Sequence, residues 1–205
     1  MPDAAGFDPV VFDLDGTVVD TVELIVESFR FATRSVLDEV LPDEVILAGV
    51  GQPLMAQMER LSADHARELY DVYREYNHRR HDELIRGYEG VSDVLGALND
   101  AGRRLGIVTS KSSDTTEHKP SPVPLHLCLE RLGAQAEGSL YVGDAPADIA
   151  AGRAAGMATA AVAWGVFGRD VLLAAGPDFW LDEPRDLLTL CLSGVGVRVS
   201  GGEGA

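Results

Sequence analysis

The chain has 205 residues, of which 46% are hydrophobic and 24% are charged, and it carries a net charge of −16 at neutral pH. This length allows one domain with a large insertion, or two small domains, around a sizeable core. The negative charge argues against nucleic acids and anionic membranes as partners, because both would be repelled. The first nine residues lack the pattern of a secretory signal, and no apolar run is long enough to cross a membrane. We therefore expect a cytoplasmic protein.

The first predicted element is a short buried strand over residues 10–12, which leads directly into two acids, Asp13 and Asp15. In open α/β sheets, ligands bind beyond the carboxyl ends of the strands. A carboxylate at Asp13 could attack phosphorus, and Asp15 could protonate the leaving oxygen and later activate water. Gly16 would bring the backbone close to a ligand above the strand. Alternatively, both acids are ordinary residues of a loop at a strand end.

Residues 18–87 have helical periodicity and no convincing strand, so we expect a helical insertion there. Near its end, His78 and Asp82 are one helical turn apart and could share a metal ion, although a solvated helix end explains them more simply. A separate possibility is that arginines from the same region face an anionic substrate; they are Arg79, Arg80 and Arg86.

Strand and helix patterns alternate after residue 88, which is typical of a parallel sheet covered by helices. We expect strands over 104–108, 139–142, 157–162 and 179–181, and helices over 92–101, 122–132, 146–155 and 187–192. The fold class is therefore α/β, with a Rossmann-like core over 1–17 and 88–193, a helical cap over 18–87 and a disordered, glycine-rich tail over 194–205.

Polar side chains follow three of these strands. Besides the two acids after the first strand, Thr109 and Ser110 follow the second, and Asp144 and Asp148 follow the third; Lys119 lies between the second and third. A hydroxyl can donate to a phosphate oxygen, a lysine can neutralise phosphate charge, and carboxylates suit Mg²⁺. Each residue alone has a plain structural explanation, but the parallel sheet would bring all of them together.

Four short motifs in this order resemble the haloacid dehalogenase superfamily, in particular its phosphatases with a helical cap inserted after the first strand. The motifs are Asp13-Leu14-Asp15-Gly16-Thr17, Val108-Thr109-Ser110, Lys119-Pro120 and Gly143-Asp144-Ala145-Pro146-Ala147-Asp148. Further stretches over 51–54, 73–84 and 163–169 are similar to phosphoglycolate phosphatases and PpaX-type pyrophosphatases.

The resemblance implies a Mg²⁺-dependent phosphatase in which Asp13 forms an aspartyl-phosphate and Asp15 is the general acid and base. Asp15 also favours a phosphatase over a dehalogenase, because dehalogenases of the superfamily lack the second acid. Thr109 and Lys119 would complete the catalytic set, and Gly16, Thr109, Ser110 and Lys119 would bind substrate. The implied metal ligands are Asp13, the backbone carbonyl of Asp15, and Asp144, with Asp148 binding directly or through water.

The resemblance also implies a small phosphorylated metabolite as partner, and a chain that is a monomer or a homodimer. Phosphoglycolate is the first expected substrate and pyrophosphate the second. A phosphosugar mutase uses the same pair of acids and would differ in its products.

The chain departs from this family between Thr109 and Lys119, where only nine residues lie. Relatives place a helix and a strand there, and a crossover helix alone needs about a dozen residues. We therefore expect the loss of one edge strand and one helix, leaving the order 5-4-1-2 in the family's strand numbering and an exposed edge that could self-associate. Alternatively, the natural protein carries a further segment here, which an intact mass far above 21.9 kDa would reveal. If Lys119 no longer reaches the phosphate, the protein is a weakened phosphatase or a binding protein.

Overall fold

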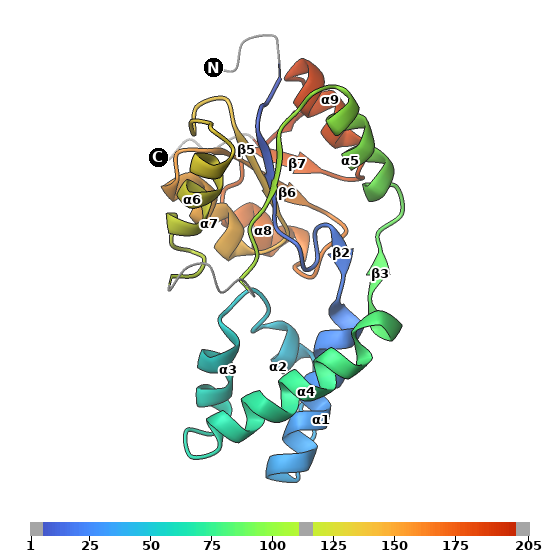
Figure 1. Ribbon diagram of the computed structural model, residues 1–205, viewed down its shortest axis with the longest axis vertical. Helices are drawn as coiled ribbons and strands as arrows, with labels where there is room; N and C mark the ends of the chain where they lie inside the picture. The colour runs from blue at the N-terminus through green and yellow to red at the C-terminus, as the bar shows by residue number, and fades with distance from the viewer. Residues whose placement is uncertain (1–5, 111–116, 200–205) are drawn as a thin grey trace.

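The computed structural model describes residues 6–110 and 117–199, with a sheet and its helices at one end and a group of four helices at the other (Figure 1). The sheet has the order β4-β1-β5-β6-β7-β8, and all pairs are parallel except β7 with β8. Its strands are β1 (Val10–Phe12), β4 (Leu105–Ile107), β5 (Leu140–Gly143), β6 (Ala158–Val162), β7 (Phe179–Leu181) and β8 (Val197–Arg198). The expected order 5-4-1-2 corresponds to β6-β5-β1-β4, so the predicted α/β core is confirmed.

Helices cover both faces of this sheet, which is why β1 is apolar and buried at every position. On one face, α5 (Val91–Asp100) and α9 (Asp186–Ser193) pack against Val10, Phe12 and Leu140. On the other face lie α6 (Val123–Arg131) and α7 (Pro146–Ala154), which contact Val11 and Tyr141. The helix α8 (Arg169–Ala174), which the sequence did not indicate, covers β6 and β7 through Leu172.

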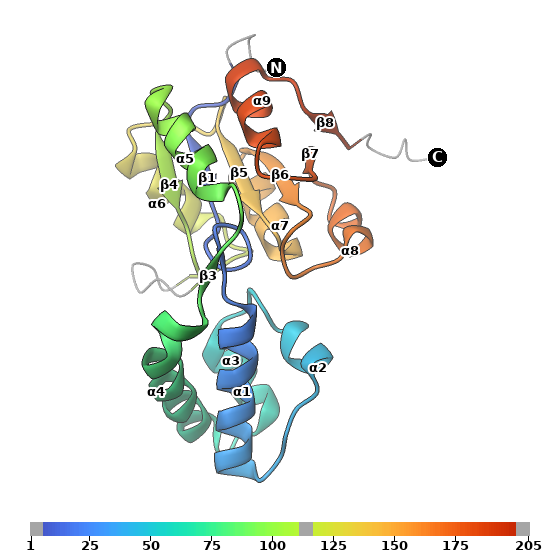
Figure 2. The same ribbon diagram turned by 90° about the vertical axis from the view of Figure 1, so that its right-hand side faces the viewer.

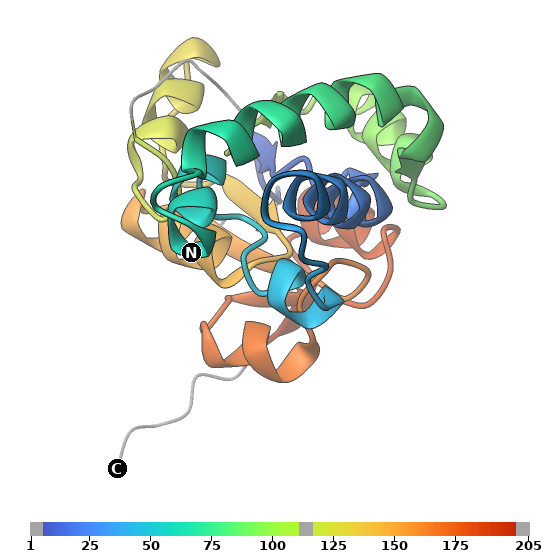
Figure 3. The same ribbon diagram turned by 90° about the horizontal axis from the view of Figure 1, so that it is seen from below.

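The helical end consists of α1 (Val22–Leu37), α2 (Asp43–Leu47), α3 (Leu54–Leu61) and α4 (Ala66–Leu84), shown side-on in Figure 2 and from below in Figure 3. These helices have their own buried cluster, which includes Phe29, Met58, Leu69 and Tyr73. We call this helical group the cap, while its boundaries at 18 and 87 remain a prediction.

Two connections join the cap to the sheet, and they pair with each other. They are the two-residue strands β2 (Val19–Asp20) and β3 (Arg86–Gly87), which run antiparallel (Figure 1). The expectation of no strand within 18–87 was therefore wrong. Two residues are too few to show an alternating pattern, and the pairing arises only because the outgoing and returning chains run side by side.

The tail also differs from its prediction. Val197 and Arg198 form β8 at the edge of β7, and the Arg198 guanidinium lies 5.0 Å from the centre of the Phe179 ring. Disorder was therefore the wrong expectation for 194–199, whereas 200–205 lie outside the described residues. Strand addition satisfies backbone groups of β7, so it needs few apolar side chains and leaves little trace in composition.

At the opposite edge of the sheet, β4 pairs with β1 and, within 6–110 and 117–199, with no other strand. Ile107 is 54% exposed there. This is the edge expected after loss of a helix and a strand, and self-association along it remains a prediction. Across the described residues, every helix is too short or too polar to cross a membrane.

Candidate active site

Three carboxylates meet where the parallel strands end. Asp13 follows β1, Asp144 follows β5, and Asp148 lies in the first turn of α7. Each of the three offers an oxygen, and these oxygens lie within 4.8 Å of one another. All three side chains are buried. The sheet order thus brings together acids that are 135 residues apart in the chain.

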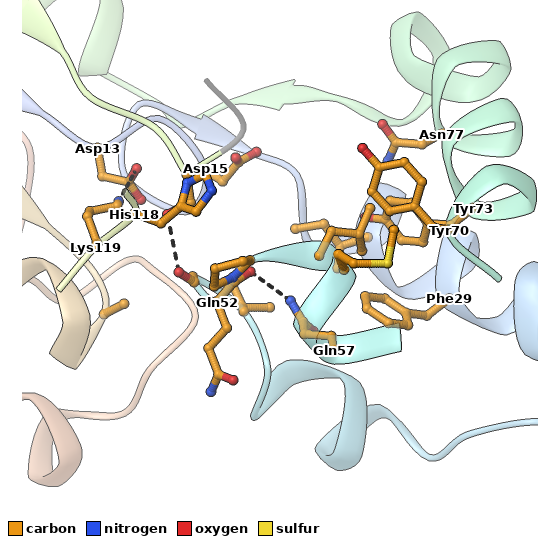
Figure 4. A pocket seen from close by; sticks show the side chains of 18 of the residues that line it. Asp13, Asp15, Phe29, Gln52, Gln57, Tyr70, Tyr73, Asn77, His118 and Lys119 are labelled. Atoms are coloured by element: carbon orange, nitrogen blue, oxygen red, sulfur yellow. Dashed lines mark hydrogen bonds and ion pairs between the residues drawn. The ribbon is translucent and has the colours of Figure 1, made fainter. Parts of the chain in front are cut away.

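Lys119 lies among these acids. Its ammonium nitrogen is 2.7 Å from Oδ1 of Asp13 and 2.6 Å from Oδ1 of Asp148, and the residue is 4% exposed. Figure 4 shows the pair Asp13 and Lys119. The short connection after Thr109 therefore does not keep the lysine away from Asp13. Burial opposes the charge of Lys119, but the two carboxylates outweigh it and raise its pKa.

Asp148 is held on both of its oxygens. Oδ1 accepts hydrogen bonds from Lys119 and from the hydroxyl of Tyr141 at 3.2 Å, and Oδ2 accepts one from the backbone N–H of Ala145 at 3.0 Å. The last bond caps the start of α7. Tyr141 is fully buried on β5, and the sequence indicated only that this position lies in a strand. Asp148 therefore anchors Lys119 from the α7 side, away from the edge where the chain is short.

Asp144 accepts hydrogen bonds from the backbone N–H of Val166 at 2.8 Å and from the Thr17 hydroxyl at 3.3 Å. Burial, and secondarily the charge of Asp148, raises the pKa of Asp144 to about 7. Burial also raises the pKa of Asp13 well above its usual value; Asp148 adds to this effect, and Lys119 offsets only part of it. Converging buried carboxylates of this kind are unfavourable unless a proton or a cation is shared among them. The oxygen donor set fits Mg²⁺.

Glycines make room for these acids. A Cβ atom on Gly16 would lie 2.2 Å from Oδ2 of Asp144, and one on Gly165 would lie 2.1 Å from the Asp144 Cβ. Gly16 also has a φ of +83°, which L side chains rarely adopt. Gly16 therefore makes room for Asp144, and its expected part in substrate binding remains a prediction.

A cavity of about 540 Å³ lies between these acids and the cap. Figure 4 shows Asp13, Asp15, His118 and Lys119 on one side. The cap wall opposite is largely apolar and aromatic, and its residues include Ile25, Phe29, Leu54, Met55, Tyr70, Tyr73, Arg74 and Asn77. The two walls touch where the Ser110 hydroxyl donates a hydrogen bond to the Gly51 carbonyl at 3.2 Å.

Asp15 lies apart from the three buried acids. Its carboxylate lines the cavity and accepts a hydrogen bond from the Thr21 hydroxyl at 2.8 Å. Among the described residues, the group whose side chains could hold a metal contains Asp13, Asp144 and Asp148 but not Asp15. This placement is compatible with a proton-transferring side chain.

Ser110 lines the cavity beneath the cap. Thr109 and Ser110 both line a second hollow of about 280 Å³ against α6, which also includes His118 and Lys119. The phosphate-binding role expected of Thr109 remains a prediction.

Sequence reasoning missed several residues of the cavity, notably His118 and Arg74. Arg79, Arg80 and Arg86 do not line it; Arg79, for example, lies over the ring of Phe31. The helical positions of Tyr70, Tyr73 and Asn77 would have indicated Arg74, because residues three and four apart share a helix face.

The alternative metal pair at the end of α4 gains no support. The ring of His81 lies 2.8 Å from Asp82 in an exposed pair, and His78 lies near Arg74. Neither histidine belongs to a group of three metal-binding side chains within the described part of the chain. A solvated helix end accounts for them.

A family model described as haloacid dehalogenase-like hydrolase matches residues 10–118 and 112–162. The chain belongs to the haloacid dehalogenase-like hydrolases. Pyrophosphatase PpaX of Anoxybacillus flavithermus is 37% identical to this hydrolase over 204 residues, covering 88% of this chain and 95% of the relative. The PpaX of Bacillus velezensis is also 37% identical, covering 87% and 94%. A haloacid dehalogenase-like protein of Streptococcus pneumoniae has a similar fold, with a TM-score of 0.80, 24% identity and coverage of 89% and 97%.

The two parts of the family match overlap over residues 112–118, which lie in the interval where a helix and a strand were expected to be missing. In addition, the alignment with the A. flavithermus protein is 204 residues long although it covers only 88% of this 205-residue hydrolase. This member of the family is therefore shorter than that relative within the aligned region.

Proposed function

We propose that this hydrolase is a Mg²⁺-dependent phosphatase that cleaves small phosphorylated compounds through an aspartyl-phosphate. The observation that carries the proposal is the placement of Lys119 between Asp13 and Asp148 at the end of a cavity roofed by the cap. An ammonium group there can neutralise both a phosphate and the carboxylate that attacks it.

In the first step, an oxygen of Asp13 forms a bond to phosphorus while the bond to the leaving oxygen breaks. Asp15, which lines the cavity, starts as the carboxylic acid and gives its proton to that oxygen, becoming a carboxylate. In the second step, Asp15 takes a proton from water, and the water oxygen attacks the phosphorus of the aspartyl-phosphate. Phosphate leaves and the Asp13 carboxylate is restored, so one water is consumed per ester cleaved.

Asp13 and Asp144 would hold Mg²⁺, with Asp148 directly or through water, and the Asp15 carbonyl completing the protein ligands. When bound, the ion supplies positive charge that offsets the repulsion between the carboxylates and the phosphate. Asp144 is oriented for this role by Val166 and Thr17. A cytoplasmic location suits such a metabolic activity.

Two substrates are proposed for first comparison. Pyrophosphate is favoured by the curated relatives, which are named pyrophosphatases and align over most of this chain. Phosphoglycolate is favoured by the resemblance of the motifs and of the cap. Both are small compounds with a second anionic group beside the phosphoryl group that is transferred.

The test measures phosphate release from both compounds with and without Mg²⁺. Asp13→Asn should abolish release while the far-UV circular dichroism stays unchanged, because an amide is a far weaker nucleophile than a carboxylate. Asp64→Asn is the matched control, since Asp64 is exposed and outside the cavity. Full activity of Asp13→Asn would reject the mechanism. Absence of turnover in the unaltered protein over a broad panel of phosphate esters would favour a binding protein on this fold.

A further inference from the structure

The arginines of α4 differ in their partners. Arg67, Arg79 and Arg80 each pair with a carboxylate of the same helix, at N–O distances of 2.9, 3.9 and 3.0 Å. Arg74 has no such pair among the described residues, and its contact there is with the His78 ring at 3.4 Å. Other arginines, such as Arg34 and Arg60, also form no ion pair among the described residues, so what distinguishes Arg74 is that it lines the cavity as well.

Arg74 is also the cation on the cap wall of the cavity. Within the described lining, the cap contributes apolar, aromatic and amide side chains together with this one guanidinium. Lys119, the other lysine or arginine there, lies at the opposite end and is already held by Asp13 and Asp148. In Figure 4, the neighbours Tyr73 and Asn77 face the acids from across the cavity.

We infer that Arg74 binds a second anionic group of the substrate, and that the preferred substrates carry this group beside the phosphoryl group that is transferred. The inference rests on the proposed function and adds a specificity-determining residue to it. The phosphoryl group occupies the end with Asp13 and Lys119, and the second anion meets the free guanidinium on the cap. A guanidinium suits this task because its planar donors match a carboxylate or a phosphate with two hydrogen bonds.

The test compares substrates with and without a second anion. Pyrophosphate and phosphoglycolate carry one, whereas ethyl phosphate and p-nitrophenyl phosphate do not. Arg74→Gln should lower kcat/KM for the first two by about 10- to 100-fold, mainly through KM, and by no more than about twofold for the others. Arg74→Lys should restore part of the loss. Arg67→Gln is the matched control on the same helix, because Arg67 is paired with Asp71 and does not line the cavity.

An equal loss for all four substrates, or no loss for any, would overturn the inference. If the unaltered protein hydrolyses none of the four, the proposed function fails, and calorimetry then decides the role of Arg74. In that experiment, Arg74→Gln should weaken the binding of pyrophosphate by the same factor and leave the binding of orthophosphate unchanged. Equal effects on the two ligands, or no binding of pyrophosphate by the unaltered protein, would reject the role.

Discussion

The Lys119 ammonium nitrogen lies 2.7 Å from a carboxylate oxygen of Asp13, although the chain between Thr109 and Lys119 is too short for the helix and strand expected there. The lysine does not depend on the shortened edge of the sheet for its position. It is held from the other side by Asp148, which Tyr141 and the start of α7 orient. The missing unit can therefore be lost without removing the cation from the site.

Replacing Lys119 should damage catalysis more than folding. Lys119→Met removes the charge beside the attacking carboxylate, so we expect kcat to fall by about 10²- to 10³-fold. Lys119→Arg should not restore activity. Lys119 is only 4% exposed and its ammonium group lies between two carboxylates, so the larger guanidinium does not fit there. Steady-state kinetics with circular dichroism as a folding check would measure this. Activity of Lys119→Met within tenfold of the unaltered protein would contradict the assignment.

Gly16 should be intolerant of a side chain. Gly16→Ala places a Cβ 2.2 Å from Asp144 at a φ of +83°, so the backbone is strained and the acid is displaced. We expect a stability loss of about 1–3 kcal/mol and a weaker response to Mg²⁺. Gly168→Ala is the control, because Gly168 has a φ of −65° and no heavy atom within 4 Å of an added Cβ. Denaturant unfolding with and without Mg²⁺ would measure the free energy of unfolding of both variants. An equal loss of stability and an equal response to Mg²⁺ in Gly16→Ala and Gly168→Ala would contradict this prediction.

The stability of the metal-free protein should fall as the pH rises through about 7. The pKa of Asp144 is about 7 in the folded protein, against an ordinary aspartate pKa of 3.8, so between these values the folded state holds a proton that the unfolded chain has lost. The contribution of this proton to the free energy of unfolding is fully present below about pH 4 and is lost as the pH rises through about 7. Asp13 acts in the same direction because its pKa is also raised.

Mg²⁺ should reverse that trend, because it binds the deprotonated carboxylates. We expect the rise in Tm on adding Mg²⁺ to be larger at pH 8 than at pH 6. Each kcal/mol of difference in the stabilisation by Mg²⁺ should change the rise by a few degrees. Asp144→Asn should reduce both the pH dependence and the response to Mg²⁺. Thermal unfolding at the two pH values would measure it, and a larger shift at pH 6 would show that the acids do not titrate in this way.

The exposed edge of β4 should promote self-association at high protein concentration. Ile107 is 54% exposed at that edge, so Ile107→Lys should lower the apparent mass in light scattering toward that of a monomer. Val171→Lys is the control, since Val171 is 48% exposed on α8 away from this edge. A monomer at all concentrations for the unaltered protein would end the idea.

The sequence by itself determined the α/β class, the order of the motifs and the strand ends that carry Asp13 and Asp144. This was possible because periodicity and strand-end position are local properties. Tertiary structure decided the rest: that Ser110 contacts the cap at Gly51, that Asp148 and Tyr141 anchor Lys119, and that β8 joins the sheet. Such outcomes depend on how distant segments lie side by side and on the direction of each side chain, and neither is encoded in a short stretch of residues. The role proposed for Arg74 also depends on tertiary structure, because only the folded chain shows that Arg74 lines the cavity and which side chains it contacts.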